Sequence, residues 1–134
     1  MNIKLDSDTI SSMNVFSDVT SVFPRDCIVR EGRMIFIVNQ GQAGVSIGKN
    51  GNKIKMLQKM FDKEITVIEY SDDPVRFLGN ILKPVELVSG YLANGVENDK
   101  KLEASAKGKI SGAKIKLAKF LMQRYFNIMN INIR

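Results

Sequence analysis

The sequence contains no histidine and no tryptophan, and Cys27 is its only cysteine. Zinc sites of the cysteine–histidine kind, disulfide frameworks and catalytic sites built on a histidine base are therefore excluded. Asp72 and Asp73 are interpreted as a helix cap, and no other cluster of acidic residues predicts a metal site or an acid–base pair. We expect no catalytic residue, no metal, no cofactor and no small-molecule substrate, so the chain is predicted not to be an enzyme.

Long apolar runs are also missing. No segment approaches the roughly 20 consecutive apolar residues that a membrane-spanning helix requires. The first residues carry Asp6 and Asp8 and lack the apolar stretch of a secretion signal. Because a lone cysteine also suits a reducing compartment, we expect a cytoplasmic protein with no membrane partner.

Acidic residues are outnumbered, with 14 Asp and Glu against 20 Lys and Arg, which gives a net charge of +6 over 134 residues. The excess lies in two stretches. Residues 45–63 contain five lysines and one acid, and residues 100–134 contain nine basic residues and one acid. The hydrophobic fraction of 44% is sufficient for a packed core. This distribution indicates a globular protein with a polyanionic partner.

Hydrophobic periodicity predicts an α+β protein in which one order of elements occurs twice. In both halves a helix precedes two strands, and a glycine-bearing loop then leads into a second helix and a third strand. The predicted elements are a helix before Pro24, strands at 27–30 and 34–38, a helix at 52–61, a strand at 64–70, a helix opening at Pro74, strands at 85–88 and 101–106 around an Asn94-Gly95 turn, a helix from Gly112, and a strand at 129–133.

A short internal repeat supports this division. Residues 51–56, Gly-Asn-Lys-Ile-Lys-Met, recur as residues 112–117, Gly-Ala-Lys-Ile-Lys-Leu. Each copy follows a glycine-bearing loop and precedes a strand, as expected for a repeated unit. The Asp72-Asp73-Pro74 cluster reads as a helix cap between the copies. We therefore place domain 1 at residues 1–71 and domain 2 at residues 72–134.

Gly48-Lys49-Asn50-Gly51 forms a G-x-x-G pattern at the start of a predicted helix. Glycines let the backbone turn tightly and approach a ligand closely because they lack a Cβ. The first N–H groups of the following helix have no partner within that helix and can bind a phosphate. Lys49 adds a cation and Asn50 a further donor. An ordinary tight turn is the plain alternative, whereas a phosphate-binding P-loop would require Ser or Thr where Asn50 stands.

The order helix, strand, strand, helix, G-x-x-G, helix, strand resembles the type II KH domain, a fold that clamps about four nucleotides of single-stranded RNA or DNA. Two such units, with residues 44–55 in the first, resemble the archaeal NusA-like transcription factors. The resemblance covers essentially the whole chain. It implies two tandem type II KH-like units, each a small three-stranded sheet packed against helices. It also implies nascent single-stranded RNA as a partner, RNA polymerase as a candidate partner, and a role in transcription elongation, termination or antitermination.

The RNA-binding residues that the resemblance implies lie in the loop and the turns beside it. Backbone amides and Lys49 would hold phosphates, while bases would lie over Ile47 and Ile54. For Lys53 and Lys55, contact with RNA and simple exposure on a helix face are equally weighted alternatives. The expected residues are Ile47, Gly48, Lys49, Asn50, Gly51, Lys53, Ile54 and Lys55.

The second unit departs from the family pattern. Residues 107–112 read Lys-Gly-Lys-Ile-Ser-Gly, a shorter stretch without a full G-x-x-G. No phosphate-clamping role is therefore assigned to Gly108 or Gly112. Basic side chains can still attract RNA electrostatically. The candidate secondary contacts are Lys107, Lys109, Lys114 and Lys116.

Two other functions remain open at the level of sequence. One is a ribosome-associated protein whose KH surface serves assembly. The other is a protein-interaction module that keeps the KH fold without RNA binding, which the degenerate second loop favours for that half. Because one fold supports several functions, analogy at the level of the fold does not choose between them.

Overall fold

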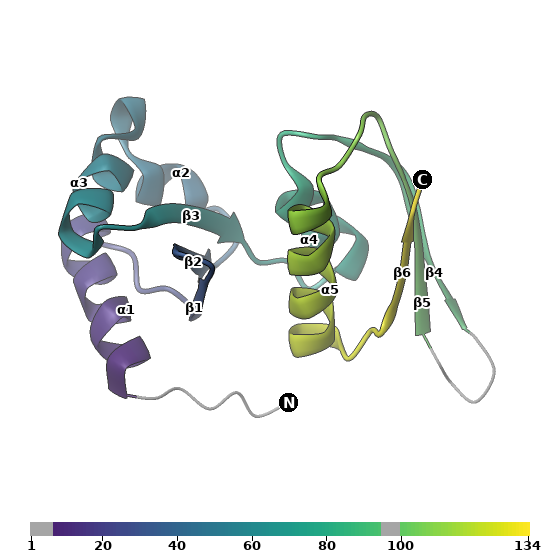
Figure 1. Ribbon diagram of the computed structural model, residues 1–134, viewed down its shortest axis with the longest axis horizontal. Helices are drawn as coiled ribbons and strands as arrows, with labels where there is room; N and C mark the ends of the chain where they lie inside the picture. The colour runs from purple at the N-terminus through teal and green to yellow at the C-terminus, as the bar shows by residue number, and fades with distance from the viewer. Residues whose placement is uncertain (1–6, 95–99) are drawn as a thin grey trace. The chain divides into compact units, whose positions relative to one another are not determined.

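Two three-stranded mixed sheets, each packed against helices, make up the structure, a computed structural model that describes residues 7–94 and 100–134 (Figure 1). The chain divides into two compact units, unit 1 (Met1–Tyr70) and unit 2 (Ser71–Arg134). The predicted α+β class is confirmed. None of the helices within the described ranges is long and apolar enough to cross a membrane.

Unit 1 has the strand order β1-β2-β3, in which β2 pairs antiparallel with β1 and parallel with β3. The parallel pair requires a crossover, and two helices with the G-x-x-G loop between them supply it. Its elements are α1 (Ser7–Thr20), β1 (Asp26–Arg30), β2 (Arg33–Val38), α2 (Ala43–Ile47), a short 3₁₀ helix η1 (Lys49–Gly51), α3 (Asn52–Phe61) and β3 (Glu64–Glu69).

Aromatic rings form the centre of the unit 1 core. Phe36 on β2 stacks on Phe16 of α1 with 4.3 Å between ring centroids, and it lies 6.1 Å from the ring of Phe61 on α3. Leu57 of α3 is fully buried in the same cluster. Because α3 is attached to this core, the loop that precedes it rests on a rigid support.

Unit 2 repeats the sheet topology in the order β4-β5-β6, with β5 antiparallel to β4 and parallel to β6. A single helix replaces the two helices and loop of unit 1. Ser111 caps that helix by accepting from the Lys114 N–H at 3.3 Å. Its elements are α4 (Pro74–Leu82), β4 (Leu87–Asn94), β5 (Lys100–Ala106), α5 (Gly112–Phe126) and β6 (Asn130–Ile133).

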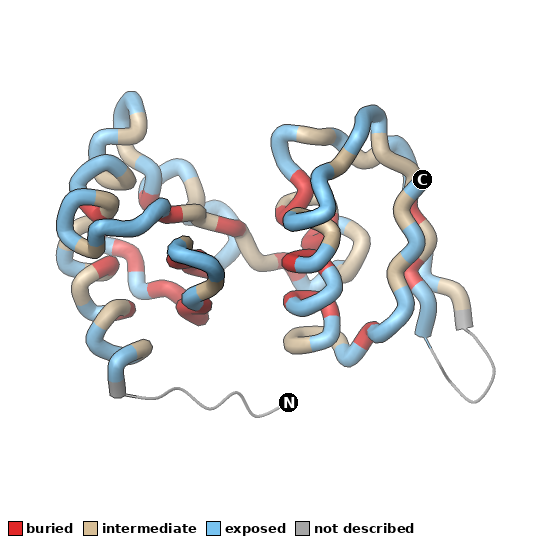
Figure 2. Tube along the Cα trace, viewed as in Figure 1, coloured by how far each residue is buried: buried red, intermediate tan, exposed pale blue. Residues whose placement is uncertain are grey.

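The core of unit 2 lies between its two helices and its sheet, where buried positions line up (Figure 2). Phe77 is central, with ring centroids of Tyr125 and Phe126 at 5.6 and 5.8 Å. Ile128, after α5, is also buried, and further buried hydrophobic side chains come from α4, α5 and β5. They are Leu78, Ile81, Leu82, Leu102, Ala104, Leu117, Ala118, Leu121 and Met122.

Local sequence signals predicted some boundaries better than others. The cap of α4 is confirmed, since the Asp73 side chain accepts from the Val75 N–H at 3.0 Å and Pro74 occupies the first turn. The strand predicted at 85–88 is wrong in extent, because β4 begins at Leu87 and pairs along β5 as far as Asn94. The turn predicted at Asn94-Gly95 reaches residues outside the described ranges.

Candidate nucleic-acid interface

The G-x-x-G loop joins α2 to α3 and combines three residues with positive φ. Gly48 has φ 80° and ψ 174°, Asn50 has φ 56°, and Gly51 has φ 71°. The conformation of Gly48 lies in a region that is essentially restricted to glycine. Asn50 adopts the left-handed conformation, which asparagine tolerates better than most residues. The pattern therefore sets the backbone of this loop.

Gly48 also has no room for a side chain. A Cβ at this position would lie 2.8 Å from Cγ of Lys53 and would overlap the amide of Asn52. A Cβ at Gly51 would meet nothing within 4 Å. The first glycine is thus required by both backbone angle and packing, and the second by backbone angle alone.

This difference predicts unequal effects of two alanine substitutions. Gly51→Ala is expected to cost about 1 kcal/mol of unfolding free energy, the usual penalty for a left-handed alanine. Gly48→Ala should cost about 2–3 kcal/mol, because backbone strain and displacement of the Lys53 side chain act together. Urea denaturation followed by circular dichroism measures both. Equal losses of unfolding free energy in the two variants would show that the packing of Lys53 against Gly48 does not contribute to stability.

The loop uses some of its main-chain donors internally. The Gly48 N–H donates to Gly44 O at 3.1 Å, the Gly51 N–H donates to Gly48 O at 3.2 Å, and the Asn52 N–H donates to Lys49 O. Within the described ranges, no hydrogen bond outside the helical turns uses the N–H of Lys49 or Asn50. These two residues are exposed. Among the donors of the loop, the N–H groups of this central pair are therefore the ones that these described hydrogen bonds leave unused.

Lys53 is engaged within the protein. Its Nζ donates to Val45 O at 3.0 Å and to Thr20 O at 3.3 Å. These bonds connect the end of α1, the middle of α2 and the start of α3. The ammonium group therefore holds the loop in place rather than extending into solvent. The sequence did not predict this role, because both acceptors are main-chain oxygens of residues distant from Lys53 in the sequence.

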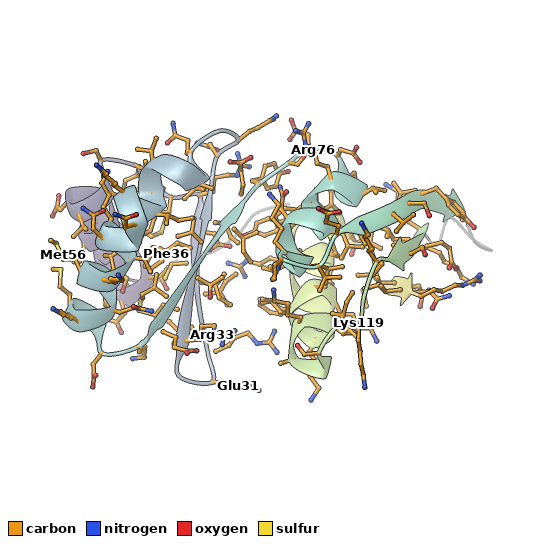
Figure 3. The ribbon with its side chains drawn as sticks, turned by 90° about the horizontal axis from the view of Figure 1, so that it is seen from above. Glu31, Arg33, Phe36, Met56, Arg76 and Lys119 are labelled. Carbon is orange, nitrogen blue, oxygen red and sulfur yellow. The ribbon has the colours of Figure 1, made fainter. Side chains whose placement is uncertain are left out.

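Apolar and basic side chains flank the loop. On α2, Val45 and Ile47 are exposed, and Ile54 on α3 is half-buried against the core. Lys49 and Lys55 are both exposed. Met56 also projects outward from α3, on the side away from Phe36 (Figure 3). The surface beside the loop thus combines two exposed cations with apolar side chains.

The lysines expected to assist in unit 2 fall into two groups. Lys107, Lys109 and Lys116 are exposed. Lys114 is half-buried, and its Nζ donates to the main-chain oxygen of Lys83. Three of the four candidate secondary contacts therefore stand on the surface, while the fourth closes the turn after α4.

The model of the KH_2 family, described as a KH domain, matches residues 12–120, which is more than half of the chain. The chain belongs to the KH-domain family. Among relatives, the "Probable transcription termination protein NusA" of Methanocaldococcus jannaschii is 35% identical over 85 residues, covering 63% of this chain and 46% of that protein. The protein of the same name from Halococcus morrhuae is 26% identical over 139 residues, covering 99% of both chains.

The crystal structure of APE1850 has a TM-score of 0.80 and 27% sequence identity, covering 97% of this chain and 100% of that one. This KH-family chain is a homologue of the archaeal NusA proteins, so the resemblance inferred from its motifs is confirmed. It spans about half the length of the first two relatives, 46% and 50%. The relatives are named as transcription factors rather than enzymes, in agreement with the expectation of no catalysis.

Proposed function

We propose that the chain binds single-stranded RNA through the G-x-x-G loop of unit 1 and acts as a NusA-like transcription factor. The observation that carries the proposal is the exposed loop, in which the described hydrogen bonds outside helical turns do not use the N–H groups of Lys49 and Asn50. Membership of the KH family supports the same ligand, because KH loops clamp the backbone of single strands. The printed names of the relatives support a role in transcription termination.

In the proposed complex, one phosphate accepts hydrogen bonds from the N–H groups of Lys49 and Asn50. The ammonium groups of Lys49 and Lys55 neutralise the strand on either side of this contact. Bases lie over Ile47 and the exposed part of Ile54, where contact with the face of a base tolerates different sequences. Gly48, Gly51 and Lys53 keep the loop in place, so their contribution is to position the donors.

Unit 2 contributes long-range attraction in this proposal. Its three exposed lysines, Lys107, Lys109 and Lys116, lie before and within the first turns of α5. Without a G-x-x-G loop they hold no particular phosphate, but they raise the local concentration of a polyanion. Unit 2 therefore attracts RNA without a fixed contact of its own.

The proposal predicts salt-dependent binding to a short single-stranded RNA. Because each neutralised phosphate of a single strand contributes about 0.7 to the slope of log affinity against log salt, Lys49 and Lys55 together should give a slope of roughly −1.4. Unit 2 lysines would make it steeper. Filter binding over a range of salt concentrations measures this slope. Absent binding at low salt, or affinity that is independent of salt, would contradict RNA binding altogether.

The transcriptional role requires a separate measurement. A pull-down with RNA polymerase, followed by sequencing of the crosslinked RNA, should recover nascent transcripts. Co-sedimentation with the small ribosomal subunit instead would support a ribosome-associated function.

A further inference from the structure

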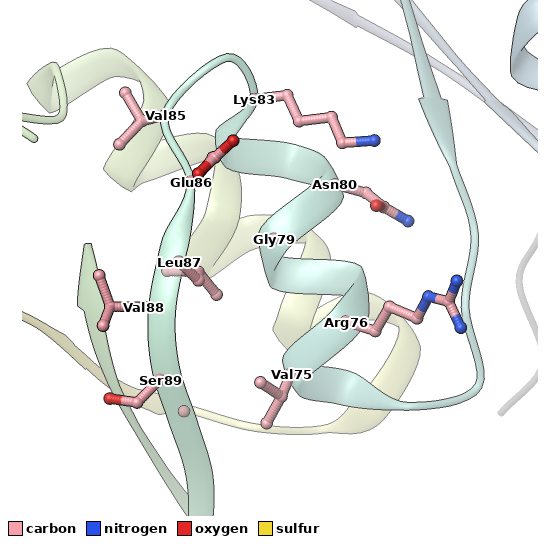
Figure 4. Close-up of a pocket in the computed structure, with 11 residues that line it drawn as sticks. Val75, Arg76, Gly79, Asn80, Lys83, Val85, Glu86, Leu87, Val88 and Ser89 are labelled. Carbon is pink, nitrogen blue, oxygen red and sulfur yellow. The ribbon is translucent and has the colours of Figure 1, made fainter. Parts of the chain in front are cut away.

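Unit 2 has a groove that the proposed RNA contacts do not use. It lies between α4 and the first half of β4, and its volume is about 440 Å³ (Figure 4). Val75 and Gly79 line it from the helix, and Leu87 and Val88 line it from the strand. All of its lining residues belong to unit 2, so the groove is distinct from the loop of unit 1.

Two glycines shape this groove. A Cβ on Gly90 would lie 2.7 Å from Cγ1 of Val75, so this glycine allows the helix and strand to approach at one end. A Cβ on Gly79 would lie 3.7 Å from Cδ1 of Leu87, so the absence of a side chain there leaves the middle of the groove open. The groove therefore depends on Gly79 and Gly90, because a larger residue at either position would fill space between the helix and the strand.

The groove runs beside an edge of the sheet of unit 2. Among the described strands β4 pairs only with β5, so its other edge has no strand partner. The eight residues of β4 include no charged residue and no proline, which are two of the usual protections of an edge strand, and its register shifts between Leu87 and Ser89. Val88 and Tyr91 are 67% and 62% exposed. The equivalent edge strand of unit 1, β1, has five residues and carries Asp26 and Arg30.

We propose that this groove and edge bind an extended segment of a partner protein, which adds to β4 as a further strand. Main-chain N–H and C=O groups along the edge match the backbone of an incoming strand. Side chains of a strand alternate between its two faces. A Cβ on Gly90 would point toward α4, so Tyr91 faces the opposite side. Alternate apolar side chains of the partner therefore enter the groove, and the intervening ones lie beside Tyr91.

Charge indicates that the partner segment is acidic at its flanks. The lining includes two basic residues, Arg76 on α4 and Lys83 directly after it, and one acidic residue, Glu86. Both basic side chains point to the side of the helix away from β4 (Figure 4). Unit 2 as a whole carries 11 Lys and Arg against six Asp and Glu. The ligand class is thus an extended peptide with alternating apolar residues and acidic neighbours. A nucleic acid strand is disfavoured because it cannot continue the main-chain hydrogen bonding of β4 as a peptide strand does.

The test selects peptides from a random dodecapeptide library displayed on phage against the full chain. Selected sequences should alternate apolar with polar residues and include Asp or Glu at their ends. Synthetic copies of them, labelled with fluorescein, are then titrated by fluorescence anisotropy. Gly79→Leu fills the groove and improves helix propensity, so affinity should fall about tenfold or more while the fold is kept.

Matched variants separate the groove from general effects. Gly112→Leu makes the same change at an open helix start, and the peptides should bind it as they bind the unaltered chain. The double variant Arg76→Glu with Lys83→Glu should lower the affinity for the acidic peptides by about tenfold.

Three outcomes would overturn the proposal. They are the absence of enriched peptides, equal binding to Gly79→Leu, and competition by single-stranded RNA. Light scattering that shows a dimer broken by Gly79→Leu would assign the edge to a second copy of the chain instead. None of these results depends on the loop of unit 1.

Discussion

Replacing Lys49 and Asn50 together with aspartate is expected to lower the affinity for short single-stranded RNA on the order of 100-fold at low salt. The double change alters three unit charges beside the bound phosphates. At about 4 Å in water each such charge interaction is worth about 1 kcal/mol, so about 3 kcal/mol is lost, and each 1.4 kcal/mol is about tenfold in affinity. Both residues are exposed, so stability should change little. Filter binding measures the effect.

The matched control is Asn14→Asp with Lys59→Asp. It makes the same change in net charge at exposed positions, one on α1 and one in the last turn of α3. Its affinity for RNA should fall several-fold at most, through general electrostatics. Equal losses in both double variants would mean that net charge alone draws the RNA. An unchanged affinity in the loop variant would show that the strand is held elsewhere.

Phe36→Ala is expected to have the largest effect on stability, lowering the unfolding free energy of unit 1 by about 3–5 kcal/mol. The Phe36 side chain is fully buried, stacked on Phe16 and in contact range of Phe61. Its removal leaves a cavity between a strand and the two helices. Hydrogen exchange followed by mass spectrometry should show faster exchange across α1, α3 and β2.

The same experiment tests whether the two units fold separately. If they do, the amides of α5 and β5 in unit 2 keep their protection when unit 1 is weakened. Phe23→Ala serves as a control, because Phe23 is 55% exposed and its truncation should cost less than about 1 kcal/mol. Loss of protection throughout the chain would show that the units unfold as one. Unaltered protection in unit 1 would contradict the role of the aromatic core.

Predictions from local signals succeeded where the interactions that form an element lie within one short segment of the sequence. Asp73-Pro74 forms the cap of α4 because a side-chain acceptor and a fixed φ act over adjacent residues. The repeat at residues 51–56 and 112–117 correctly marked the start of the helix that follows each loop. The degenerate second loop was likewise recognisable, since its shortened spacing leaves no room for the two helices of unit 1.

Other features depend on contacts between distant segments. β4 extends to Asn94 because β5 offers it a partner along that length, although residues 89–94 show no strong strand pattern. The role of Lys53 depends on Thr20 and Val45, whose carbonyl oxygens converge only in the folded unit. The groove beside β4 depends on the approach of α4, which Gly90 permits.

The sequence by itself determined the repeated order of elements, the glycine-bracketed loop and the excess of basic residues, because periodicity, backbone freedom and charge are properties of neighbouring residues. Only the tertiary structure decided which lysine braces the loop, which N–H groups the internal hydrogen bonds of the loop use, and which edge strand lies beside a groove. These depend on carbonyl groups, helices and strands brought together from separate parts of the chain, and no local pattern encodes such distances.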